Sequence, residues 1–220
     1  MAFEVLDEHE QGELVRKWLH TNAMSILIGI AIGLLLIFGY QQWKARDLRT
    51  QSEAASQFAA FSDAVEAKRS DDANRIAEAL RKDYAKSAFA SFSALRQAEV
   101  SVGKADLKAA AEDLEWASKS ADNTALKSLI ALRQARLSLA DGKADAALAK
   151  LDQIAKTDFP ALASELRGDA LAKLGRAADA RAAYAEALTQ LDPQSPDRAY
   201  IEMKQGDLAV ADKVPEQKKS

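Results

Sequence analysis

The chain has 220 residues, of which 33 are acidic and 30 basic, with two histidines and no cysteine. Five acidic and two basic residues lie in residues 1–17, so the rest of the chain carries 28 of each and lacks the excess positive charge of a nucleic-acid-binding protein. Both histidines, His9 and His20, precede residue 23, which leaves the larger part of the chain without a histidine or cysteine for catalysis or metal binding. We therefore predict that the protein is not an enzyme and needs no cofactor, metal or small-molecule substrate.

The first predicted element is a membrane-spanning helix. Residues 18–43 contain no charged residue, and the apolar stretch 23–40 would form a helix of about 27 Å, close to the ~30 Å hydrocarbon thickness of a bilayer. A buried helix of a soluble protein seldom runs this long without a charge, and a cleaved signal peptide would have a basic start and a shorter apolar run. We expect a short N-terminal tail over 1–22 and a retained single-pass anchor over 23–43.

Three small residues within the anchor, Ser25, Gly29 and Gly33, recur every four positions and therefore share one face of a helix. Small residues at this spacing let two transmembrane helices approach closely, which favours a packing face for a membrane partner. Glycine is also common in membrane helices in general, so both interpretations of this face remain open.

Residues 44–212 predict a domain of helical repeats, followed by a frayed tail over 213–220. The sequence ALRQA at 94–98 recurs at 131–135, an offset of 37, and GKAD at 103–106 recurs at 142–145, an offset of 39. An offset of 33 relates five further pairs, which are Ala135 and Gly168, Gly142 and Gly175, Ala147 and Ala180, Leu151 and Tyr184, and Pro160 and Pro193. A period of this length, with a glycine between two helical segments, is typical of a helix–turn–helix solenoid.

The repeats predict an all-α fold, in which the single transmembrane helix precedes a solenoid of four helix pairs. The expected pairs are 51–69 with 71–84, 87–102 with 105–119, 122–141 with 143–157, and 160–174 with 176–191, and a capping helix follows near 195–211. The last pair resembles a tetratricopeptide repeat (TPR). In it Gly168 and Ala180 are the small residues of the two helices, Gly175 is the turn and Tyr184 the aromatic that fills the interface.

The concave face of such a solenoid is a candidate partner-binding groove, because residues of each first helix that point away from the second helix line it. An alternative interpretation is that these residues form ordinary solvated helix faces. The candidates are Leu129, Leu132 and Arg136 in the third unit, and Leu162, Glu165, Asp169 and Lys173 in the fourth.

Two segments resemble the family of ancillary SecYEG translocon subunits, the YfgM-like family. The first is the acidic lead-in 7–13 with the basic-aromatic step Arg16-Lys17-Trp18 and Asn22, and the second comprises 165–171 and 180–184 of the last repeat. The resemblance covers essentially the full length. It implies a bacterial inner-membrane protein whose N-terminus is cytoplasmic and whose repeat domain is periplasmic. It also implies two partners, the SecYEG translocon and a membrane-anchored periplasmic chaperone.

The charges beside the span favour the opposite orientation by a small margin. Arg16 and Lys17 precede the span, whereas Lys44, Arg46 and Arg49 follow it, and the more basic flank usually stays in the cytoplasm. We give the family resemblance more weight and expect a periplasmic domain. The alternative function is a single-span TPR receptor or assembly factor for another cell-envelope complex, which would share every local feature and differ only in its partner.

Overall fold

The computed structural model describes residues 8–211, and the side chains of residues 12–208. Within this range the chain forms nine α-helices and no strand, which confirms the expected all-α class. The chain divides into two compact units, one up to Glu53 and one from Ala54 onwards. The first helix, α1 (Glu8–Glu66), begins inside the expected N-terminal tail and contributes residues to both units. The expected tail 213–220 lies outside the described residues.

The first unit consists of α1 up to Glu53, and no other described element belongs to it. α1 is the one described helix that is long and apolar enough to cross a membrane, and none of its apolar window is buried. Most of its large apolar side chains are exposed, by between 53 % at Ile28 and 72 % at Met24. A helix of a soluble core would bury such side chains, so their exposure is what a lipid-facing segment requires.

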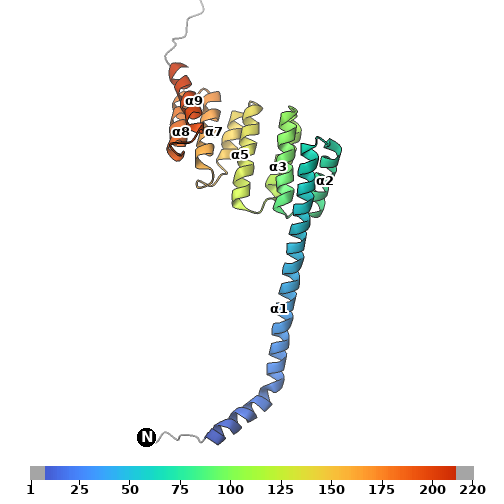
Figure 1. Ribbon diagram of the computed structural model, residues 1–220. Coiled ribbons are helices and arrows are strands. Elements are labelled where there is room, and N and C mark those ends of the chain that lie inside the picture. Colours follow the sequence, from blue (N-terminus) through green and yellow to red (C-terminus); the bar gives the residue numbers. More distant parts are fainter. Residues whose placement is uncertain (1–7, 212–220) are drawn as a thin grey trace, which may run out of the picture. The chain divides into compact units, whose positions relative to one another are not determined.

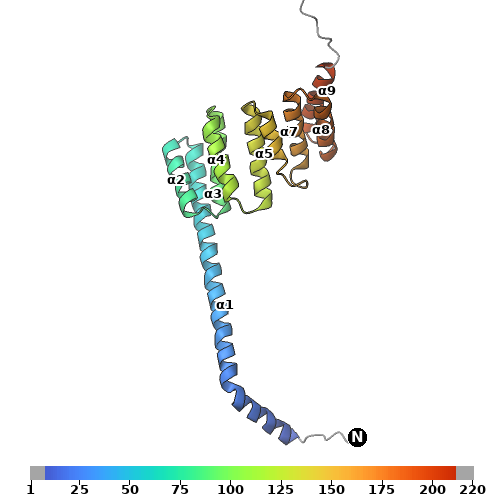
Figure 2. The ribbon, with the colours of Figure 1, turned by 180° about the vertical axis from the view of Figure 1, so that it is seen from behind.

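The second unit contains the expected helix pairs, stacked in chain order as Figures 1 and 2 show from opposite sides. The end of α1 and the first residues of α3 pack on α2 through a shared apolar cluster, and the next two pairs bury clusters of leucine and alanine. The helices after α1 are α2 (Ser70–Asp83), α3 (Ala88–Gly103), α4 (Leu107–Ser120), α5 (Thr124–Ala140), α6 (Ala144–Leu151), α7 (Pro160–Lys173), α8 (Ala177–Gln190) and α9 (Asp197–Ala211).

Polar side chains explain where three of these helices begin. Ser87, Asp106 and Asn123 precede α3, α4 and α5, and each accepts a hydrogen bond from a backbone N–H in the first turn of its helix. These bonds satisfy donors that have no partner within the helix.

One helix is shorter than expected, since α6 ends at Leu151 rather than at residue 157. The N–H groups of Gln153 and Ile154 bond three residues back instead of four, so the helix tightens and stops. The following loop leads to Phe159, which adopts a left-handed conformation directly before Pro160. Proline disfavours a helical conformation in the residue that precedes it, which separates this loop from α7.

The turn between the two helices has the same backbone conformation in all four pairs. Lys68, Ala105, Gly142 and Gly175 all have positive φ, between 56° and 77°. In each turn the next residue donates its N–H to the carbonyl five residues earlier, at 2.8–2.9 Å, which is the bond that closes a Schellman motif. The turn residues are 37, 37 and 33 positions apart.

These turns correct one repeat assignment. The structural counterpart of Gly142 is Ala105, at the ALRQA offset of 37, and not Gly103, which is still the last residue of α3. The second GKAD segment therefore begins at a turn residue, whereas the first begins two residues before one. The offset of 39 between the two GKAD segments therefore relates positions that are not equivalent in the structure.

The last pair shows why a TPR-like unit needs small residues. A Cβ placed on Gly168 would lie less than 3.0 Å from three ring atoms of Tyr184, so only glycine fits without displacement. Ala180 and Ala187 are fully buried beside Tyr184, which is 3 % exposed. Gly168 and Ala180 are thus close-contact positions, as the sequence predicted.

Candidate partner-binding surface

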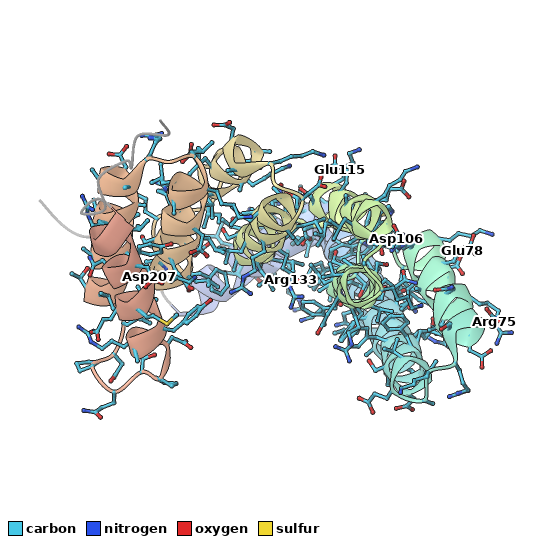
Figure 3. The ribbon with its side chains drawn as sticks, turned by 90° about the horizontal axis from the view of Figure 1, so that it is seen from above. Arg75, Glu78, Asp106, Glu115, Arg133 and Asp207 are labelled. Atoms are coloured by element: carbon cyan, nitrogen blue, oxygen red, sulfur yellow. The ribbon has the colours of Figure 1, made fainter. Side chains whose placement is uncertain are left out.

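A groove runs between α3 and α5 in the second unit. It encloses about 410 Å³ and combines an apolar floor with charged edges. Viewed from above, the helices of this unit follow an arc, with Arg133 on its inner side and Glu115 on its outer side (Figure 3). The groove therefore opens on the concave face. The lining residues are Ala98, Glu99 and Val102 of α3, Leu114 of α4, and Arg133, Arg136, Leu137 and Ala140 of α5.

The negative charge at this groove is paired within the chain, whereas the positive charges are not. The Glu99 carboxylate accepts a hydrogen bond from Arg96 at 2.8 Å and is neutralised within its own helix. Among the described side chains, no hydrogen-bond or ion-pair partner is found for Arg133 or Arg136. The groove consequently presents two uncompensated positive charges beside apolar surface.

Of the three groove candidates in the third unit, the structure places only Arg136 in this groove. Leu129 is half-buried against the core of the second and third repeats. Leu132 is 2 % exposed and belongs to the core formed with α6 and α7, so its assignment to a binding surface is wrong. A leucine at this position satisfies the helical pattern for either face, and only the close approach of α7 decides that it is covered.

The four candidates of the fourth unit take part in contacts within the chain. Leu162 packs on the core around Leu132. The Lys173 ammonium donates to the carbonyl oxygen of Leu139 at 3.0 Å, near the end of α5. The carboxylates of Glu165 and Asp169 both accept hydrogen bonds from Lys204 of the capping helix, the two side chains being 16 % and 25 % exposed.

Lys204 is the central residue of this last cluster, and the repeat pattern did not single it out. Its ammonium lies 2.8 Å from Glu165 Oε1 and 2.8 Å from Asp169 Oδ1, and 4.5 Å from the ring centre of Tyr200. Burial would lower the pKa of Lys204, but the two carboxylates outweigh it and hold that pKa above its ordinary value. Burial raises the pKa of the Tyr184 hydroxyl, and so does the hydrogen bond that it donates to Asp169 at 2.7 Å. Both groups therefore keep their protons, and the cluster fastens α9 to α7.

A second and larger cavity, of about 720 Å³, lies between the first two repeats. Arg81 of α2 dominates it, donating to Asp113 of α4 and, at 2.8 Å, to Gln97 of α3, while its guanidinium stacks 5.2 Å from the Trp116 ring centre. Burial raises the pKa of Asp113, and the neighbouring Arg81 opposes that rise. Because Arg81 belongs to the first repeat and contacts both helices of the second, we interpret it as a structural link between the two repeats.

Two further predictions concern chemistry and the anchor. No group of three metal-ligating side chains occurs in the part of the chain that the structure describes. In the first unit Ser25 is exposed, and a Cβ on Gly29 or Gly33 would meet no atom within 4 Å. The small-residue face is therefore uncovered, and its role in membrane packing stays a prediction.

Comparison with known proteins gives three curated relatives, each named an ancillary SecYEG translocon subunit. The Escherichia coli K12 protein is 28 % identical over 206 residues, which are 93 % of this chain and 98 % of the relative. The Neisseria gonorrhoeae protein is 28 % identical over 86 % of this chain and 87 % of its own length. The Haemophilus influenzae protein is 25 % identical over 77 % of this chain and 82 % of its own length.

No solved structure matches the chain significantly. The family model of the tetratricopeptide repeat-like domain matches residues 16–210, a stretch that begins before the apolar segment and ends within α9. The chain therefore belongs to the family of tetratricopeptide repeat-like domains.

Proposed function

We propose that this protein is a membrane-anchored interaction scaffold that associates with the SecYEG translocon. The apolar part of α1 holds it in the bacterial inner membrane as a single span, with the N-terminus in the cytoplasm and the repeat unit in the periplasm. The observation that carries this proposal is the likeness to three ancillary SecYEG translocon subunits, because in the Escherichia coli relative it extends over 93 % of the chain and so includes both the anchor and the repeats.

The proposal extends to a second partner, a membrane-anchored periplasmic chaperone. The scaffold would hold this chaperone beside the translocon so that emerging polypeptides meet a folding factor. An open groove on a concave helical face supports such a role, since repeat solenoids present this face to partner segments. A tether in the same membrane would raise the effective concentration of both partners, so that weak contacts suffice.

Co-purification from mildly solubilised membranes tests the proposal. We expect the tagged full-length chain to retain SecYEG, and a Gly29→Ile/Gly33→Ile variant to retain less if the small-residue face packs against the translocon. Isoleucine is favourable in the hydrocarbon core, so insertion itself survives. Ala31→Ile is the matched control, because residue 31 lies on the opposite side of the helix. Absence of SecYEG from the wild-type eluate, with the chain itself recovered, would refute the proposed association.

A reporter fusion tests the orientation. Alkaline phosphatase joined after Ser220 is expected to be active, because that enzyme needs disulfides and these form in the periplasm. A green fluorescent protein fusion at the same site is expected to be dark. A stable but inactive phosphatase fusion together with a fluorescent partner fusion would reverse the assigned topology.

A further inference from the structure

The groove between α3 and α5 is exposed apolar surface beside two positive charges that the described chain leaves uncompensated. Val102 of α3 is 45 % exposed there, although valine side chains are usually buried. Across the groove, Arg133 and Arg136 are three residues apart on α5 and so extend from one side of the helix. Glu99 does not balance them, because Arg96 already pairs with its carboxylate at 2.8 Å.

The next repeat shows that a charge at the position of Arg136 can be balanced by a charge from another helix. Asp169 is the counterpart of Arg136 at the offset of 33, and it is not free, because Lys204 of α9 binds it and Glu165 at 2.8 Å. α9 thus docks through a charge opposite to the one that the repeat presents, while its Ile201 is buried in the apolar cluster of the same unit. Beside α5 the place of α9 is taken by α7, which covers Leu132, whereas the groove lies on the side of α5 that faces α3. There the charge is positive, and no described carboxylate pairs with Arg133 or Arg136.

We propose that this groove binds a polypeptide segment that presents an apolar side chain flanked by carboxylates. The apolar side chain lies on Val102, Leu137 and Ala140, and the carboxylates meet Arg133 and Arg136. The inference rests on the proposed function, since it specifies the chemistry of a partner for the scaffold. A polypeptide fits better than a lipid surface or a nucleic acid, because the charge is confined to two arginines at an apolar floor and the chain beyond residue 17 has no net positive charge.

Charge-matched peptides provide the test. The full-length chain is placed in nanodiscs of zwitterionic phosphatidylcholine and titrated into two fluorescein-labelled peptides, one alternating leucine with glutamate and its twin alternating leucine with lysine. Two exposed charge pairs predict that the acidic peptide binds about tenfold more tightly than the basic one. The Arg133→Glu/Arg136→Glu variant is expected to reverse this preference.

A matched control separates local contacts from overall charge. The Lys108→Glu/Lys127→Glu variant makes the same charge change at two exposed positions outside the groove, and at 0.15 M salt it should leave the preference unchanged because of screening over about 8 Å. Equal affinity for the twin peptides would overturn the proposal, and so would an equal effect of both double variants. Phosphatidylglycerol vesicles are the competitor, and displacement of the acidic peptide by them would assign the arginines to lipid headgroups instead.

The two proposals can fail separately. A chain that retains SecYEG but does not distinguish the peptides keeps its role as a translocon subunit and loses the acidic-segment groove. A chain that distinguishes the peptides but does not retain SecYEG has the groove and a different membrane partner.

Discussion

Replacing Gly168 by alanine adds a single methyl group at the closest helix approach in the fourth repeat. The new Cβ would lie 2.5 Å from Cδ1 and 2.9 Å from Cζ of Tyr184, whereas carbon atoms in contact prefer about 3.5–4.0 Å. The ring or the helix must therefore retreat by about 1 Å. The ring has no room to do so, since Tyr184 is 3 % exposed and its hydroxyl is bonded to Asp169 at 2.7 Å.

The expected cost follows from these contacts. Overpacking of this kind costs about 1–3 kcal/mol, and loss of the tyrosine hydrogen bond adds about 1 kcal/mol. The higher helix propensity of alanine relative to glycine offsets this cost by about 1 kcal/mol. We expect a net destabilisation of about 1–3 kcal/mol, measured by urea denaturation of the soluble fragment 44–220 and followed by circular dichroism, with an unchanged dependence on urea.

A second glycine provides a control of opposite sign. A Cβ on Gly206, within α9, would meet no atom within 4 Å, so Gly206→Ala should stabilise the fragment by up to about 1 kcal/mol. In a Tyr184→Leu background, which removes the ring, Gly168→Ala should lose most of its cost. If Gly168→Ala proves as stable as Gly206→Ala, the reasoning about the contact with Tyr184 is wrong.

Three further variants test the packing of the repeats. Ala180→Leu, at a fully buried site, should lower the free energy of unfolding by about 1–3 kcal/mol, whereas Leu at the exposed Lys127 should change it little, and equal urea midpoints would contradict the TPR-like packing. Arg81→Leu should cost about 1–3 kcal/mol at neutral pH, because it leaves Asp113 half-buried without its cation. Burial already raises the pKa of Asp113 above 3.8, and loss of Arg81 raises it further. The loss of folding free energy in this variant should therefore grow as the pH rises through the raised pKa and shrink below pH 3.8. A loss that does not depend on pH would argue against the pairing. Lys204→Met should speed amide hydrogen exchange in α9. Because the pKa of Lys204 is raised, the protection of α9 in the wild type should persist through pH 10.5 and fall only above it. Equal protection in the wild type and the variant would show that Lys204 does not hold α9.

The sequence alone was sufficient to predict the long apolar N-terminal helix, the fold class and the positions of most helices. Each depends on local chemistry, namely an uncharged run as long as a bilayer is thick, a helical period, and residues that cap or end a helix. The roles of Gly168 and Tyr184 could also be predicted from the sequence. Close approach of two helices requires a small residue opposite a large one, and the repeat places that pair at a fixed offset.

The tertiary structure decided which residues of the predicted groove are available. Leu132 and Arg136 lie four residues apart on one helix face, yet the first is buried by α7 and the second is exposed. Asp169 is engaged by Lys204, a residue 35 positions away, while Arg136 meets no partner in the described chain. A periodic pattern specifies a face of a helix. What covers that face depends on helices far away in the sequence, and so does the free groove between α3 and α5.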